Sequence, residues 1–230
     1  MFGDNPARPQ EVGDGLNLWM QEIFYTLQGE GPFTGHPAVF VRLAGCNLSC
    51  FWCDTEFESS TWHPSLDQVL ASIACERPSF CDLIVITGGE PFRQNIGPLV
   101  QNLLAQNLRV QIETNGTLWV DLPVSDRLHI VCSPKTARLN EKLVARIGSY
   151  KYIIAAGQVD ETDGLPAFST QKVNVRERIA RPVAGADVYL LPLDSYNAET
   201  NEKNTQECVG AALKFGYRLT LQMHKSIGVR

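Results

Sequence analysis

The chain has 230 residues, of which 44% are hydrophobic and 20% charged, as in an ordinary globular protein. Its formal net charge of −5 gives no basic surface of the kind that binds nucleic acid or anionic membranes. The apolar runs are too short to span a bilayer, and residues 1–15 lack the apolar stretch of a signal peptide, so we expect a cytoplasmic protein.

Strand and helix patterns alternate along the chain. We expect strands at 37–43, 82–86, 109–113, 128–132, 150–155, 187–191 and 217–223, and helices at about 65–75, 96–106, 140–147 and 199–215. This alternation indicates βα units and a parallel sheet. We therefore predict an α/β fold, a partial (open, truncated) TIM-like barrel of about six parallel strands with few helices. Residues 1–17 are expected to be a disordered extension, and residues 18–230 the core domain.

Four of the expected strands are each followed by a short polar motif. In chain order these are the cysteine loop after residue 43, Thr87-Gly-Gly-Glu, Thr114-Asn-Gly and Ser133-Pro-Lys. Because the carboxyl ends of parallel strands meet at one rim, we expect the four motifs to converge there.

The first of these motifs, Cys46-x3-Cys50-x2-Cys53, can bind three irons of a [4Fe–4S] cluster and leave the fourth iron open for chemistry. A zinc site is the alternative, and it would need a fourth ligand such as His63. Seven cysteines, three of them crowded together, do not suit a secreted disulfide framework. The four cysteines outside the motif are expected to be small buried hydrophobes: Cys75, Cys81, Cys132 and Cys208.

The second motif, Gly88-Gly89-Glu90-Pro91, lets a ligand approach the backbone closely because glycine has no Cβ. The Glu90 carboxylate suits an ammonium group. Taken alone, the motif could equally be an ordinary turn. After the cysteine motif and at the end of a strand, it is interpreted as a site for the amino-acid end of a cofactor.

These two motifs resemble those of the radical S-adenosylmethionine (SAM) superfamily. The resemblance implies that the amino and carboxylate groups of SAM bind the open iron. One electron then cleaves the sulfonium, and the resulting 5′-deoxyadenosyl radical abstracts hydrogen from a substrate.

Further segments resemble those of the 7-carboxy-7-deazaguanine synthases within this superfamily. They are 22–35, 40–46, 52–55, 112–117, 133–135 and 222–225, and the resemblance runs from about residue 21 to the C-terminus. It implies a carbon–nitrogen lyase of the queuosine and deazapurine pathways, which contracts 6-carboxy-5,6,7,8-tetrahydropterin to 7-carboxy-7-deazaguanine with loss of ammonia. It also implies a homodimer, a requirement for Mg²⁺, and a reducing flavoprotein or ferredoxin-type electron donor.

The resemblance assigns roles to individual residues. Cys46, Cys50 and Cys53 would bind the cluster, and Thr55 would bind Mg²⁺. The substrate would contact Leu27, Gln28, Gly29, Arg42, Thr87 and the C-terminal Arg230. SAM would contact Gly89, Glu90, Glu113, Asn115, Ser133, Pro134 and Lys135.

Leu191 departs from the family pattern, because many relatives have glutamine at this position before the proline. A cofactor contact by that amide is therefore expected to be absent or replaced. Two other functions fit the cysteine motif: an activating enzyme that forms a glycyl radical on a partner protein, and a non-catalytic iron–sulfur or zinc module. The activating enzyme does not explain the segments at 22–35 and 52–55, and the four converging motifs argue against the non-catalytic module.

Overall fold

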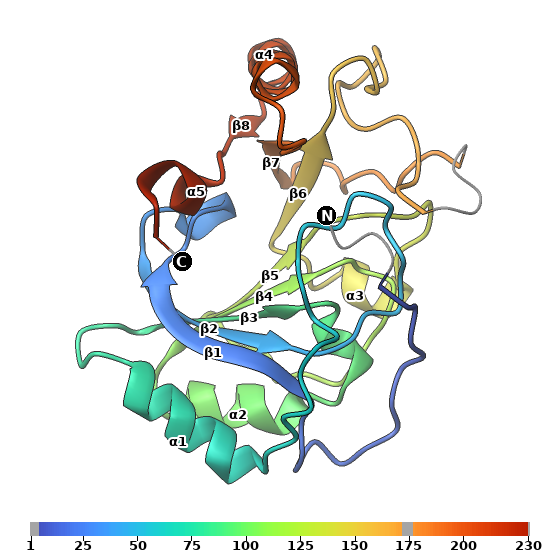
Figure 1. Cartoon of the computed structure of the whole chain (residues 1–230). Helices are drawn as coiled ribbons and strands as arrows, with labels where there is room; N and C mark the ends of the chain where they lie inside the picture. Colours follow the sequence, from blue (N-terminus) through green and yellow to red (C-terminus); the bar gives the residue numbers. More distant parts are fainter. Residues whose placement is uncertain (1–4, 172–176, 230) are drawn as a thin grey trace.

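The computed structural model describes residues 5–171 and 177–229. Its centre is a mostly parallel sheet with the strand order β1 to β8 (Figure 1). The strands are β1 (Met20–Leu27), β2 (Pro37–Leu43), β3 (Leu83–Gly88), β4 (Arg109–Thr114), β5 (Leu128–Cys132), β6 (Ser149–Ile154), β7 (Asp187–Pro192) and β8 (Arg218–Leu219). Within the described ranges no pairing joins β8 to β1, so the sheet is open, which confirms the predicted fold class.

The sheet has eight strands, where about six were predicted. Each of the seven expected segments overlaps one strand, β1 is added at one edge, and the strand at the other edge is shorter than expected. β1 pairs antiparallel with β2 and was not predicted as a strand; its burial shows no regular alternation. At the other edge, the strand expected at 217–223 is reduced to β8. Helix α5 (Met223–Ile227) begins where that strand was expected to end.

The helices cover part of the sheet. They are α1 (Leu66–Glu76), α2 (Gly97–Ala105), α3 (Glu141–Val144) and α4 (Ala198–Phe215), with short 3-10 turns at Gly31–Phe33 and Pro91–Arg93. The Ser65 side chain caps α1, and Gln68 completes a capping box. α3 is a single turn, shorter than expected. Among the described residues, no helix has both the length and the apolar character needed to cross a bilayer.

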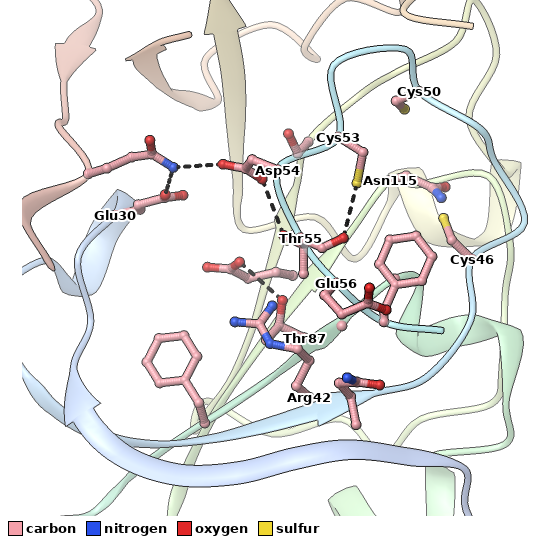
Figure 2. A pocket seen from close by; sticks show the side chains of 18 of the residues that line it. Glu30, Arg42, Cys46, Cys50, Cys53, Asp54, Thr55, Glu56, Thr87 and Asn115 are labelled. Atoms are coloured by element: carbon pink, nitrogen blue, oxygen red, sulfur yellow. Dashed lines mark hydrogen bonds between the residues drawn. The ribbon is translucent and has the colours of Figure 1, made fainter. Parts of the chain in front are cut away.

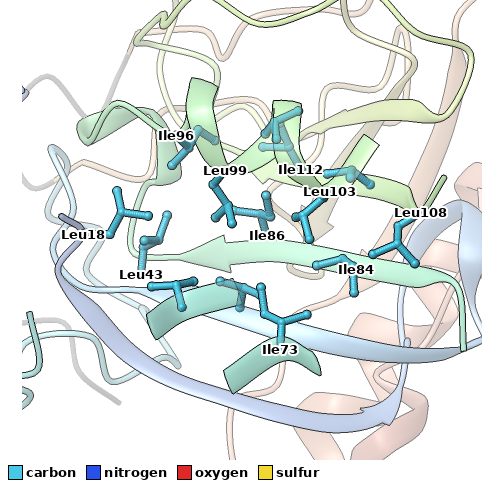
Figure 3. Close-up of a cluster of buried hydrophobic side chains, with 14 of the residues drawn as sticks. Leu18, Leu43, Ile73, Ile84, Ile86, Ile96, Leu99, Leu103, Leu108 and Ile112 are labelled. Carbon is cyan, nitrogen blue, oxygen red and sulfur yellow. The ribbon is translucent and has the colours of Figure 1, made fainter. Parts of the chain in front are cut away.

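Strand alternation sends neighbouring side chains to opposite faces of the sheet. One face packs on α1 and α2, where Val41, Ile84 and Ile86 are fully buried in the larger apolar cluster (Figure 3). On the same strands, Arg42 and Thr87 face the other way and are register partners across β2 and β3. The period of two therefore places polar residues inside the open barrel.

A second apolar cluster joins β6, β7 and α4 around Tyr150, Tyr152 and Cys208. Three of the four cysteines outside the motif are buried, as expected. Cys75 is exposed, so that expectation is wrong for it. This residue lies near the end of α1, on the face turned away from the sheet.

The segment 5–17 contacts the core at several points. The Arg8 N–H donates to the Cys46 carbonyl at 2.7 Å, and the Arg8 guanidinium pairs with Glu58. Further along, Glu11 pairs with the buried Arg93 at 2.7 Å. The segment is thus attached to the cysteine loop and to the turn after β3.

Candidate functional site

A cavity of about 560 Å³ opens at the carboxyl ends of the central strands. It is enclosed by the cysteine loop, the loop after β1 and the C-terminal α5 (Figure 2). Most residues assigned from the sequence line it: Leu27, Gln28, Arg42, Cys46, Cys50, Cys53, Thr55, Thr87, Gly89, Glu113, Asn115, Ser133 and Lys135. The expected convergence of the four motifs on one rim is therefore confirmed.

Three assigned residues do not line the cavity: Gly29, Glu90 and Pro134. A Cβ on Gly29 would lie 2.3 Å from Nδ1 of His224, so this glycine is covered by α5. Arg230, assigned to the substrate, lies outside the described residues.

Glu90 is fully buried beneath the rim, and three protein donors already bind its carboxylate. Thr114 Oγ1 donates to it at 2.7 Å, the Asn115 N–H at 2.7 Å and the Phe92 N–H at 3.0 Å. Burial raises the pKa of Glu90 to about 7, although these hydrogen bonds favour the carboxylate. Through these hydrogen bonds the Glu90 carboxylate joins the loops after β3 and β4.

The two glycines of the second motif are required by close packing against the cysteine loop. A Cβ on Gly89 would lie 2.2 Å from the Gly45 carbonyl oxygen and 2.9 Å from Cys46 Cβ. Gly88 has φ +138 and would place a Cβ 2.2 Å from the Leu43 carbonyl oxygen. The Cys-x3-Cys-x2-Cys and Gly-Gly-Glu motifs therefore form one interlocked unit.

All three cysteines of the loop line the same cavity, and the sulfurs of two of them accept hydrogen bonds. The Leu48 N–H donates to Cys46 Sγ at 3.4 Å, and two side-chain donors reach Cys50 Sγ. Within the part of the chain that the structure describes, no three His, Cys, Asp or Glu side chains are close enough to hold a single metal ion. A cubane cluster takes three such thiolates, each on a different iron. The donor set therefore fits an iron–sulfur cluster.

Burial raises the pKa of the Cys46 thiol to about 12, with a smaller contribution from the Glu90 charge. Burial also raises the pKa of Cys53. Iron binds thiolates, so loading of a cluster must displace these protons.

The floor of the cavity carries a hydrogen-bonded group that includes residues assigned to the pterin. Glu113 accepts from Gln28 Nε2 at 3.1 Å and from Thr87 Oγ1 at 3.4 Å. Glu113 was assigned to SAM, but it lies with the residues assigned to the substrate. Arg42 donates through Nε to Glu22 at 2.8 Å, and this contact does not use its two terminal nitrogens.

A buried ion cluster that the sequence did not reveal lies beside this floor. Lys151 Nζ is 2.6 Å from Glu30 and 3.4 Å from Glu113. Burial opposes charge on Lys151, but the two carboxylates raise its pKa above the usual value. Burial likewise opposes charge on Glu30, and Lys151 nevertheless holds its pKa below the usual value. The Leu-Gln-Gly-Glu segment signalled Glu30, whereas nothing in the local sequence signalled Lys151.

Thr55 lies between Cys53 and Arg42 in the view of Figure 2. Its hydroxyl donates to Asp54 at 3.2 Å. The second Asp54 oxygen accepts from Gln222 Nε2 at 3.2 Å, and the same amide donates to Glu30 at 3.0 Å. This hydroxyl and carboxylate are the oxygen donors that Mg²⁺ prefers, so the residues fit a site for that ion.

Lys135 projects toward the cysteine loop from the end of β5. Its ammonium donates to the Ser133 carbonyl at 2.9 Å and lies 5.5 Å from the centre of the Trp52 ring. Burial lowers the pKa of Lys135, while the nearby Cys50 works in the opposite direction. Such a partly desolvated cation is suited to binding a carboxylate.

Comparisons with known proteins identify relatives of this chain. A family model described as the radical SAM superfamily matches residues 41–158. A 7-carboxy-7-deazaguanine synthase of Rhodospirillum rubrum is 57% identical, with 100% of both chains covered. Another, of Rickettsia prowazekii, is 40% identical and covers 100% of this chain and 96% of its own. The crystal structure of QueE from Escherichia coli, at 24% identity, has the same fold, with a TM-score of 0.66 over 90% of this chain and 95% of that chain.

Proposed function

Because the chain belongs to the radical SAM superfamily and, within it, to the 7-carboxy-7-deazaguanine synthases, we propose that it converts 6-carboxy-5,6,7,8-tetrahydropterin to 7-carboxy-7-deazaguanine with loss of ammonia. One observation carries this proposal. The cysteine loop and four residues assigned to the pterin line a single cavity of about 560 Å³; the four are Leu27, Gln28, Arg42 and Thr87. A radical formed at the rim can therefore reach a substrate bound on the floor.

Cys46, Cys50 and Cys53 would hold a [4Fe–4S] cluster with one open iron. When bound, the cluster and SAM supply one-electron chemistry that ends in abstraction of a substrate hydrogen. The protein's own contribution is positioning: the target C–H must be held close to the radical, and competing donors must be kept away.

Arg42 supplies the contact for the substrate carboxylate. Its terminal nitrogens suit a bidentate pair, and its Nε is fixed by Glu22 at 2.8 Å. Gln28 and Thr87 hold the pterin ring with the help of Glu113, to which both donate. Leu27, the last residue of β1, supplies an apolar contact to the pterin.

For SAM, we propose contacts with Gly89, Asn115, Ser133 and Lys135, all of which line the cavity. Lys135 is the cation for the carboxylate of the cofactor. Glu90 and Pro134 do not line the cavity, but they neighbour these residues in the chain and help to position them. Leu191 lines the cavity but offers only an apolar surface to the cofactor.

Thr55 would bind Mg²⁺ through its hydroxyl, with the substrate carboxylate and waters completing the octahedron. A bound ion there would orient the pterin and stabilise negative charge during the rearrangement. Asp54 accepts a hydrogen bond from the Thr55 hydroxyl, which leaves the lone pairs of the Thr55 oxygen directed toward the cavity.

We also propose that the enzyme acts as a homodimer in the cytoplasm and takes its electron from a reduced flavoprotein or ferredoxin. The family resemblance supports the dimer. A reducing compartment suits the free cysteines found throughout the described residues.

Reductive cleavage of SAM tests the proposed chemistry. The reconstituted protein should release 5′-deoxyadenosine when reduced, and a Cys50→Ser variant should not. A passive iron–sulfur or zinc module would release none in either form. A glycyl-radical activating enzyme would need a partner protein as its substrate. This enzyme should convert the pterin without any partner protein.

A further inference from the structure

Two side chains that the sequence did not single out lie against the sulfur of Cys50. Thr170 Oγ1 is 3.1 Å from Cys50 Sγ, and Gln171 Nε2 is 3.2 Å from the same atom. Both residues are remote in sequence, 120 and 121 positions away. Neither belongs to the residues assigned above.

The backbone around these side chains is attached to the cysteine loop on both sides of Cys50. The Ser49 N–H donates to Gln171 Oε1 at 3.1 Å, and the Phe51 N–H donates to the Thr170 carbonyl at 3.3 Å. Cys50 and Gln171 form an antiparallel bridge. Several independent contacts therefore fix the approach of the two donors to the sulfur.

The protons can be assigned along this network. The Gln171 amide nitrogen lies 3.2 Å from Thr170 Oγ1 and 3.2 Å from Cys50 Sγ, and it is the donor in both contacts. The hydroxyl has one hydrogen, and its nearer acceptor is Cys50 Sγ rather than the Lys135 carbonyl at 3.4 Å. Both donors are thus directed at one sulfur.

The geometry points to Thr170 and Gln171 as positioning residues that hold the Cys50 sulfur on its iron and raise the reduction potential of the bound cluster. This inference rests on the proposed function in one respect, that Cys50 is a cluster ligand. Hydrogen bonds to cluster sulfurs stabilise negative charge, and the reduced cluster carries one electron more than the oxidised one. The donors therefore favour the reduced form, which is the form that must deliver an electron to SAM.

The test is a redox titration of the loaded protein, monitored by the electron paramagnetic resonance of the reduced cluster, with no pterin present. The donor-removing variants are Thr170→Val and Gln171→Leu. Thr170→Ser keeps the hydroxyl and serves as the conservative control. Ser169→Ala is the matched control. Ser169 is a buried neighbour whose hydroxyl donates to the Lys135 carbonyl at 3.0 Å and accepts from the Gln171 N–H at 3.3 Å, so its removal tests the support of this segment without removing a side-chain donor to Cys50.

We expect the ratio of reduced to oxidised cluster, at a fixed potential, to fall about tenfold when both donors are removed, a shift of ~59 mV for a one-electron couple. Each single variant should show part of this shift. Thr170→Ser and Ser169→Ala should titrate like the wild type. Unchanged potentials in both donor-removing variants, or an equal shift in Ser169→Ala, would overturn the inference.

Iron content covers the case in which a variant does not load. If Thr170→Val and Gln171→Leu lose iron while melting like the wild type, and both controls load fully, the donors are needed to hold Cys50 on the cluster. If Ser169→Ala loses iron as well, the segment only supports folding and the inference fails. Because the titration omits the pterin, its result is separate from that of the turnover assay.

Discussion

Removal of the buried ammonium at the cavity floor should destabilise the protein strongly. Lys151→Met keeps the length of the side chain but leaves two carboxylates without their cation. The Lys151 side chain is 7% exposed, and those of Glu30 and Glu113 are 14% and 18% exposed. Breaking such a buried pair by removing one partner costs about 3 to 5 kcal/mol.

The change is measured by thermal unfolding of the variant and the wild type at pH 7. For a chain of this size each kcal/mol moves the midpoint by about 2 to 4 °C, so we expect a decrease of about 6 to 20 °C. Lys203→Met is the matched control, because Lys203 pairs with Glu199 on the exposed surface of α4 at 64% and 78% exposure. An exposed pair of this kind contributes only about 0.3 to 0.5 kcal/mol.

The penalty should depend on pH in a defined direction. The pKa of Glu30 is lowered in the folded protein, so its contribution is present above the ordinary value of 4.5 and is lost as the pH falls. The pKa of Lys151 is raised, so its contribution is present below the ordinary 10.5 and is lost at higher pH. The difference between wild type and Lys151→Met should therefore be largest between these values. A loss at pH 7 no larger than that of Lys203→Met would refute the reasoning.

Three further variants probe the rim of the cavity. Gly89→Ala should bind much less iron, because the added Cβ would lie 2.2 Å from the Gly45 carbonyl oxygen. Gly210→Ala is the control and should bind iron normally, because no atom lies within 4 Å of its added Cβ. Equal iron content in the two variants would contradict the interlocking of the two motifs. Thr55→Ala should retain iron but lose most of its stimulation by added Mg²⁺, and equal stimulation in both proteins would remove Thr55 from the metal site. Deletion of residues 1–11 removes the contact to the Cys46 carbonyl, so the cluster absorbance should decay faster in air, whereas an unchanged rate would show that the segment gives no protection.

The sequence predicted what depends on local pattern. The apolar patterns of β2 and β3 predicted these strands. The motifs at the strand ends predicted which residues line the rim. Because parallel strands share a direction, these motifs had to converge. The site could be assembled on that argument without any knowledge of the packing.

What could not be predicted depends on contacts between distant parts of the chain. Lys151 meets Glu30 across 121 positions, and Thr170 meets Cys50 across 120. The sequence also does not show that Thr114 and Asn115 donate to the Glu90 carboxylate.

The prediction of the two edge strands failed for a related reason. Half-buried β1 lacks the alternation that identifies a strand, and β8 is only two residues long before the chain turns to α5. The burial of Cys75 was mispredicted for the same kind of reason, because it depends on how α1 packs against the rest of the protein.

The central claim is that one cavity brings the cluster and the pterin together for a single reaction. The direct measurement is an anaerobic assay of the reconstituted protein with 6-carboxy-5,6,7,8-tetrahydropterin, SAM, Mg²⁺ and a reductant, read by mass spectrometry. We predict 7-carboxy-7-deazaguanine with the wild type, none with Cys50→Ser, and a strongly raised KM with Arg42→Lys. Cleavage of SAM by a fully loaded wild-type protein that leaves the pterin unchanged would contradict the account.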